Sequence, residues 1–157
     1  MALGKYAVEF SNFTTPITTP DTAVSLEAAA AESGEVIEII MTGSGVAAAV
    51  DRQHTCLAQF CTFLTAGTGT ALTETEFDER SNAGLLAGVG EYSAEPTTIA
   101  ADASVRFGFN QRGGMRWAVP RGEGITVRGG DTNDGLCITV VSDAAGAVDG
   151  MAHWWEP

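Results

Sequence analysis

Few side chains in this sequence could carry catalysis. A Ser-His-Asp or Cys-His site would have to use one of the two histidines, His54 and His153, which lie far apart in the sequence. The sequence contains no GxSxG nucleophile elbow, no P-loop and no GxGxxG between a strand and a helix. We therefore expect a protein without enzymatic activity.

The three cysteines, Cys56, Cys61 and Cys137, could in principle bind a metal together with His54. His54 and Cys56 would face the same side of a strand, whereas Cys56 and Cys61 would face opposite sides. Zinc sites normally show paired ligands at tighter, repeated spacing. An odd number of cysteines without a CxxC pair also fits a reducing compartment better than a disulfide framework. We therefore expect free, mostly buried thiols, with no metal and no cofactor.

Two acidic stretches could supply calcium ligands. Glu74–Glu79 lacks the alternating Asp/Asn pattern and the glycine of a compact calcium loop. Asp131–Gly135 has a more suitable composition, but it equally matches a turn between two strands. We expect the first stretch to be a solvated face and the second to be an ordinary turn.

Arginines and tryptophans in the C-terminal part are typical of an interface. Five arginines lie within residues 106–128, and Phe107, Phe109 and Trp117 lie between them. An RNA surface could look similar, but the net charge of −12 opposes phosphate binding. The planar guanidinium also pairs with carboxylates at protein interfaces.

Trp154 and Trp155 are adjacent, so in a strand they point to opposite faces. One of them can fill the core while the other is exposed or meets a partner, unless both faces of this last strand are covered. The candidate interface residues are Arg112, Arg116, Arg121, Trp154 and Trp155.

The distribution of charge indicates where a partner would bind. Residues 1–100 hold thirteen acidic and three basic residues, whereas residues 101–157 hold seven acidic and five basic residues. An anionic partner should therefore meet the second part, and a neighbouring copy of this acidic chain is a suitable one. We do not expect nucleic acid as a partner, because of the negative net charge. We do not expect a membrane either, because no apolar run approaches the roughly 20 residues of a membrane span. No segment resembles a signal peptide.

Turn-forming residues recur at short intervals and leave little room for helices. Between the turns lie short segments with alternating or β-branched and aromatic residues, which indicate half-buried strands. In Glu35–Thr42, Ile37, Ile39 and Met41 are expected on one face and Glu38 on the other. The clearest strands are Tyr6–Phe10, Glu35–Thr42, Thr55–Leu64, Ser104–Phe109, Met115–Val119, Gly124–Val127, Leu136–Val141 and Met151–Trp155. The sequence therefore predicts one all-β domain over residues 1–157, a jelly roll or β-sandwich of about 8–10 short antiparallel strands.

Two segments are ambiguous. Asp21–Glu32 has an Ala-rich stretch of high helix propensity, but the alternation of Val24, Leu26 and Ala28 favours a strand. Leu72–Pro96 is acidic at first and then rich in Gly, Ala and Ser, and we expect a long loop over residues 72–96, with at most a short helical turn.

Taken in order, several segments resemble those of a known family. They are YAVEFS at residues 6–11, VIEII at 36–40, GTGTALT at 67–73, FGFNQR at 107–112, MRW at 115–117 and WWE at 154–156. The chain resembles the small structural proteins of tailed bacteriophages, in particular single jelly-roll decoration, or cement, proteins of the capsid. The resemblance extends along nearly the whole length, and it consists of turns and packing residues without a catalytic signature.

This resemblance implies a virion protein on the capsid surface, assembled in the host bacterial cytoplasm and often a homotrimer. Its partners would be other copies of itself and the phage major capsid protein, and its role would be to stabilise the shell. A tail or neck protein is a close alternative. A carbohydrate-binding jelly-roll module is another, with Trp154 or Trp155 stacked on sugar rings. A cupin-like enzyme would need two or three histidines at one barrel mouth, which two remote histidines do not supply.

Overall fold

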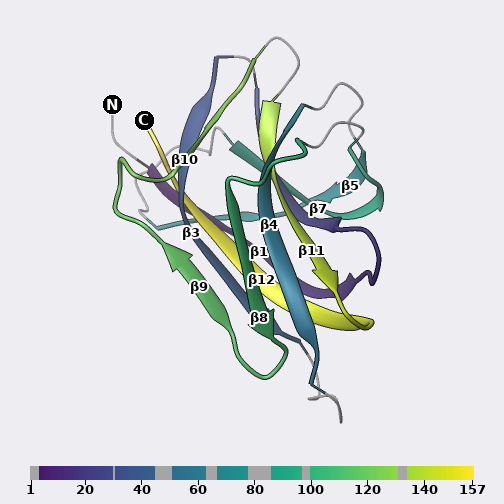
Figure 1. The fold of residues 1–157 in the computed structure, drawn as a ribbon. Helices are drawn as coiled ribbons and strands as arrows, with labels where there is room; N and C mark the ends of the chain where they lie inside the picture. Colours follow the sequence, from purple (N-terminus) through teal and green to yellow (C-terminus); the bar gives the residue numbers. More distant parts are fainter. Residues whose placement is uncertain are drawn as a thin grey trace.

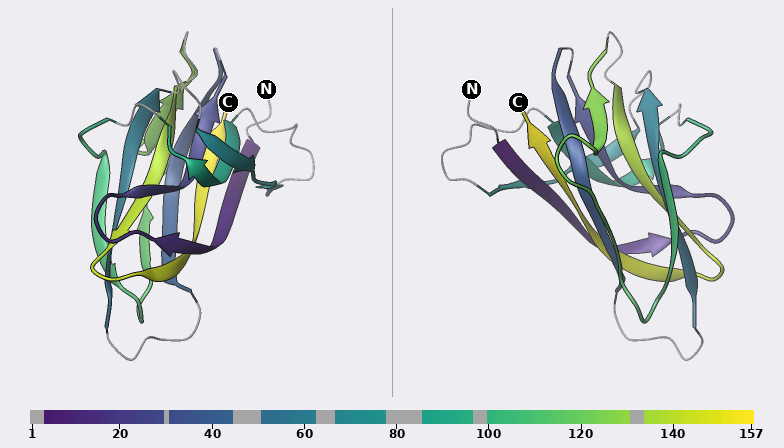
Figure 2. Two further views of the ribbon diagram at one scale, coloured as in Figure 1. Left: turned by 90° about the vertical axis from the view of Figure 1, so that its right-hand side faces the viewer. Right: turned by 60° about the vertical axis from the view of Figure 1, so that its left-hand side comes forward.

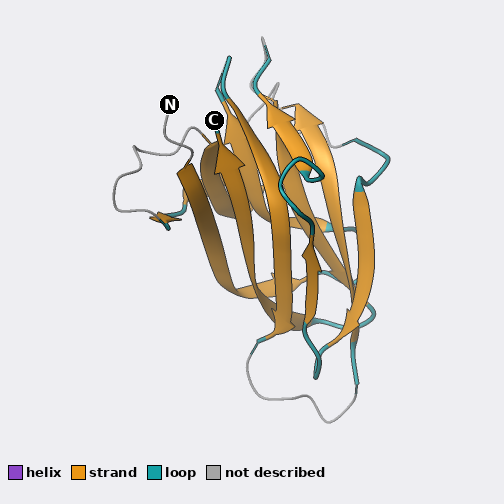
Figure 3. Ribbon diagram, turned by 90° about the vertical axis from the view of Figure 1, so that its left-hand side faces the viewer, coloured by secondary structure: helices purple, strands orange, loops and turns teal. Residues whose placement is uncertain are grey.

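Two antiparallel β-sheets packed face to face form the molecule (Figure 1). The computed structural model describes residues 4–29, 31–44, 51–62, 67–77, 86–96, 100–130 and 134–157, and these contain strands, turns and loops but no helix. Figure 3 shows the strands of both layers with the loops gathered mainly at the two ends. The strands are β1 (Gly4–Thr15), β2 (Asp21–Ala28), β3 (Ser33–Gly43), β4 (Gln53–Thr62), β5 (Thr68–Ala71), β6 (Glu74–Glu76), β7 (Leu86–Ala94), β8 (Val105–Asn110), β9 (Met115–Ala118), β10 (Ile125–Arg128), β11 (Asp134–Ser142) and β12 (Gly146–Glu156).

The order of the strands is that of a jelly roll. Sheet A has the order β10-β3-β12-β1-β6, with β9 beside β10 on the same edge of β3, and sheet B has the order β5-β7-β2-β11-β4-β8. The chain passes from one sheet to the other between all consecutive strands except β4 and β5, β7 and β8, and β9 and β10. The groups β1-β12-β3-β9 and β2-β11-β4-β8 thus form the two facing halves of a double Greek key. This confirms the predicted all-β jelly-roll sandwich.

The first and last strands lie at the middle of sheet A. β1 pairs with β12 from Gly4 opposite Glu156 to Thr15 opposite Gly146, which brings the two ends of the described chain together (Figure 2). The inward faces of both sheets supply the core, and Trp154 is its largest fully buried side chain. Trp154 stacks on Tyr6 with a centroid distance of 5.8 Å and donates its indole N–H to Glu156 at 2.7 Å. The polar tip of a deeply buried tryptophan is thereby satisfied.

The strands expected from alternation are all present, and so is β2, which was the ambiguous Ala-rich segment. In β2, burial of Val24, Leu26 and Ala28 at 0–1% exposure overrides the helix propensity of the segment. The expected faces of β3 are partly wrong. The pairing with β12 shifts between Glu38 and Val36, which leaves Ile37 in a bulge and places Val36, Ile39 and Met41 in the core.

The expected long loop at residues 72–96 is also wrong. It contains β6 and β7, and β7 pairs with β2 inside sheet B. Two of the glycines that suggested a loop are there because other segments, β1 of the facing sheet and the loop residue Leu72, pack closely against β7. A Cβ at Gly88 would lie 2.8 Å from Val8, and one at Gly90 would lie 2.9 Å from Leu72. Residues 78–85 lie outside the described part of the chain.

The cysteines differ from the expectation of three free thiols. Cys61 on β4 and Cys137 on β11 form a disulfide, and Cys56 is the free, buried thiol. Gly135 is directly opposite Cys61, and Cys137 is two positions further along the same strand, so both sulfurs lie on the same, outer face of sheet B. Cys56 faces the core, on the opposite side from Cys61 as expected, and burial raises the pKa of its thiol.

Candidate interaction surface

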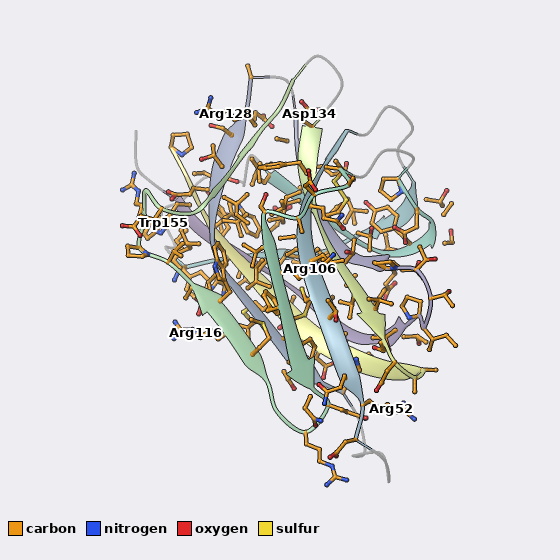
Figure 4. The ribbon with its side chains drawn as sticks, in the orientation of Figure 1. Arg52, Arg106, Arg116, Arg128, Asp134 and Trp155 are labelled. Atoms are coloured by element: carbon orange, nitrogen blue, oxygen red, sulfur yellow. A yellow bond between two sulfur atoms is a disulfide. The ribbon has the colours of Figure 1, made fainter. Side chains whose placement is uncertain are left out.

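The outer face of sheet A gathers aromatic and cationic side chains from four parts of the chain. Alternation in β12 sends Trp154 inward and Trp155 and His153 outward, and the same alternation in β1 and β9 sends Lys5 and Arg116 outward. Figure 4 shows Trp155, near the end of β12, and Arg116, on β9, on the same side of the molecule. We name this surface the sheet A patch. It consists of Lys5, Phe77, Arg116, Arg121, His153 and Trp155.

Two cation–aromatic contacts lie within the sheet A patch. The guanidinium carbon of Arg121 lies 5.6 Å from the centroid of the Trp155 ring, and Nζ of Lys5 lies 4.6 Å from the centroid of the Phe77 ring. Phe77 is 54% exposed, which is unusual for so large an apolar side chain. A small pocket of about 230 Å³ lies beside Trp155 and Arg121. Exposed aromatic rings next to cations are the composition enriched in protein interfaces.

Arg116, Glu38 and His153 form a hydrogen-bonded network in another part of the sheet A patch. The Nε–H of Arg116 donates to one carboxylate oxygen of Glu38, and Nδ1 of His153 lies 2.6 Å from the other oxygen. The ring of Phe77 packs edge-on against His153, with centroids 5.2 Å apart. Burial alone would raise the pKa of Glu38, but the hydrogen bonds and charges of Arg116 and His153 outweigh burial, so its pKa is lowered. The carboxylate therefore holds the side chains of Arg116 and His153 in place on the face of the sheet.

The predicted interface residues do not all meet. Arg116, Arg121 and Trp155 lie in the sheet A patch, whereas Trp154 is fully buried and its side chain cannot reach a partner. Arg112 lies in the turn after β8, where its Nε is 2.8 Å from Asp51. Phe107 and Phe109 pack into or against the core. The arginines of residues 106–128 come from strands of both sheets and from turns, so they are spread over several surfaces. Sequence reasoning missed Lys5 and Phe77, because only the pairing of β1 with β6 brings these two side chains together.

A second feature is a groove of about 810 Å³ along the bend of β1, bordered also by β2, β3, β7 and β12. Its apolar surface comes chiefly from Phe10, Phe13, Ala23, Ile40, Leu72 and Met151. Five carboxylates line it, those of Glu9, Asp21, Glu91, Glu95 and Asp149. Its volume is in the range of ordinary ligand sites.

Two of the five carboxylates in the groove have structural roles. Glu95 accepts hydrogen bonds from the backbone N–H and the hydroxyl of Thr22, and Asp149 accepts one from the backbone N–H of Asn12 at 2.6 Å. Glu9, Asp21 and Glu91 have no ion pair within the described residues. These three are therefore available to an incoming cation.

The residues considered for catalysis or metal binding do not converge. His54 is buried, stacks on Phe109 at 5.0 Å between centroids, and shares a hydrogen bond with the hydroxyl of Ser142. Burial lowers the pKa of His54. His54 and Cys56 face the core while Cys61 and Cys137 lie on the other side of sheet B. Among the described residues, no three His, Cys, Asp or Glu side chains are placed to hold a metal ion.

Of the two acidic stretches, only parts are described. Glu74–Glu76 forms β6, and the carboxylate of Glu74 accepts the N–H of Gly88 at 3.1 Å, so this stretch is not purely a solvated face. Burial raises the pKa of Glu74. Residues 78 and 79, and residues 131–133 of the expected turn, lie outside the described residues.

Comparisons with known proteins add no further information. No protein-family model matches the chain, and no curated protein or solved structure is significantly similar to it. Within the described residues there is no helix that could cross a membrane.

Proposed function

We propose that this chain is a non-enzymatic structural protein of a tailed-phage virion, which binds the capsid surface and stabilises the shell. The observation that carries the proposal is the sheet A patch, where exposed Phe77 and half-buried Trp155 lie beside cations at the surface of an otherwise acidic protein. The resemblance of the sequence to capsid decoration proteins supports the partner, and the jelly-roll scaffold is consistent with it. The other copies of a homotrimer and the major capsid protein are the proposed partners.

The physical basis for binding is the mixture of groups in the sheet A patch. Trp155 and Phe77 offer apolar area that gains free energy when a partner excludes water. Arg121 and Lys5 lie directly over these rings, so a partner carboxylate that pairs with them is drawn onto the apolar area as well. Lys5, Arg116, His153 and Trp155 lie on strands, which limits the conformational entropy that is lost when the patch docks, whereas Phe77 and Arg121 lie just after β6 and in the turn after β9.

A carbohydrate-binding module is the second candidate. The pocket of about 230 Å³ beside Trp155, lined also by Glu35 and Arg121, could accept one sugar ring against the indole. A tail or neck location is the third possibility and uses the same surface. The sheet A patch is favoured for protein binding because its cations and rings extend well beyond this pocket to Phe77 and Arg116.

The test is a shell-binding assay. Empty shells are assembled from the major capsid protein encoded in the same genome, and the bound copies of this protein are counted after sedimentation. We expect saturable binding and a higher temperature of shell disruption. Trp155→Ala should weaken binding by at least about thirtyfold, the equivalent of about 2 kcal/mol for a central aromatic anchor.

Phe60→Ala is the matched control, because Phe60 is a 44% exposed aromatic residue on β4, away from the sheet A patch. It should bind shells like the wild type. Absence of wild-type binding, or equal effects of the two substitutions, would contradict the proposal. Binding of a glycan on an array, abolished by Trp155→Ala, would favour the carbohydrate module instead.

A further inference from the structure

The groove along the bend of β1 has no role in the surface proposed above. Its walls are largely apolar, and its volume of about 810 Å³ is large enough to receive side chains from another molecule. Glu9, Asp21 and Glu91 reach its border without an ion pair in the described part of the chain. A groove of this kind is complementary to a surface that is both apolar and cationic.

The negative charge of the groove limits the kinds of molecule that can bind in it. An anionic ligand would be repelled by five carboxylates, and a purely apolar one would desolvate them without compensation. A surface that presents ammonium or guanidinium groups beside aromatic rings satisfies both requirements, because the cations pair with the carboxylates while the rings cover the apolar walls.

The chain itself carries such a surface. The sheet A patch combines Lys5 and Arg121 with Phe77 and Trp155. It holds three of the eight Lys and Arg residues of a protein whose net charge is −12, so two copies repel one another in most orientations. An orientation that places the patch of one copy against the groove of another reverses this repulsion locally.

We propose that the occupant of the groove is a second copy of this chain, whose sheet A patch docks into it. This inference rests on the proposed function, because it uses the same patch and names its partner in the oligomer. The contact joins two different surfaces of the chain, so each copy can both give its patch and receive another. Added salt should weaken the association, since the contact depends on opposite charges near the surface.

The experiment uses two charge-reversed variants of the full chain. The patch variant is Lys5→Glu with Arg121→Glu, and the groove variant is Glu9→Lys with Glu91→Lys. The control is Asp102→Lys, which reverses the charge of an exposed carboxylate at the far edge of sheet B. Circular dichroism and cooperative melting establish that each variant is folded. Sedimentation velocity then measures self-association of each variant alone and of the two mixed in equal amounts.

We expect the wild type and Asp102→Lys to associate, and each double variant alone to associate at least tenfold more weakly. The equimolar mixture should associate again, because the unaltered patch of the groove variant fits the unaltered groove of the patch variant. A monomeric wild type, a groove variant that associates like the wild type, or a mixture that stays monomeric would overturn the inference.

The shell-binding assay separates this result from the proposed function. If the groove variant self-associates normally while the patch variant fails to bind shells, the inference is wrong and the proposed function stands. If the patch variant binds shells like the wild type, the proposed function itself is wrong.

Discussion

Reduction of the disulfide between Cys61 and Cys137 should destabilise the fold substantially. The two cysteines are separated by 76 positions, so the bond closes a long loop in the unfolded chain. The chain-entropy relation gives about 4.5 kcal/mol for a loop of this length, and measured effects are typically about 2–4 kcal/mol. Replacing both residues by Ala removes little apolar packing, because they form a small cluster of their own outside the main core. We therefore expect Cys61→Ala with Cys137→Ala to lower the free energy of unfolding by about 2–4 kcal/mol.

The assay is urea unfolding of the oxidised wild type, the reduced wild type and the double variant. The reduced wild type and the double variant should unfold at similar, lower urea concentrations. Cys56→Ala is the control, because Cys56 is a free thiol in the core. The free energy of unfolding of Cys56→Ala should differ from that of the wild type only by the loss of packing at this position. Reductant should still lower it, because the disulfide is intact in this variant. The reasoning is refuted if reductant leaves the wild-type midpoint unchanged, or if alkylation of the unfolded, unreduced protein labels all three cysteines.

Three further predictions concern the core. Gly88→Ala should cost about 1–3 kcal/mol, because the added Cβ would lie 2.8 Å from Val8; an unchanged urea midpoint would contradict the close approach. Trp154→Phe should cost about 1–3 kcal/mol by removing the indole N–H that Glu156 accepts, measured in the same way, and wild-type stability would argue against that bond. Burial lowers the pKa of His54, so as the pH falls the imidazole takes up a proton in the unfolded chain before it does so in the folded protein. The free energy of unfolding is therefore highest above about pH 6.5, the pKa of an unperturbed histidine, and decreases below it. His54→Gln should lose less stability than the wild type between about pH 7 and pH 5, and identical losses would contradict a buried neutral imidazole.

Much of the fold follows from the sequence because alternation and turn residues are local signals. The strands β1–β4 and β8–β12 were predictable from them, including β2, where alternation outweighed an Ala-rich composition. β7 was not predictable, because Gly88 allows the close approach of β1 from the other sheet and Gly90 allows that of Leu72 from a loop, and neither approach has a local signature. The bulge at Ile37 likewise depends on the pairing of β3 with β12 and cannot be read from β3 alone.

The candidate surface was partly predictable for the same reason. Alternation separates Trp154 from Trp155, but the sequence does not show which of the two faces the core; pairing with Tyr6 decides it. Phe77 and Lys5 are brought to the surface by the pairing of β1 with β6, a contact between distant segments. The disulfide was missed because cysteines at unrelated positions become neighbours only when β4 pairs with β11.

Hydroxyl-radical footprinting of the protein bound to capsid shells tests most directly whether the sheet A patch is the docking surface. Phe77, Ile17 and Phe60 are the large apolar side chains most exposed in the described residues, at 54%, 57% and 44%, so each should be oxidised in free protein that is diluted until it is monomeric. Upon binding, Phe77 and Trp155 should become protected while Ile17 and Phe60 keep their reactivity. Protection of Phe60 or Ile17, with Phe77 and Trp155 oxidised as before, would contradict the account.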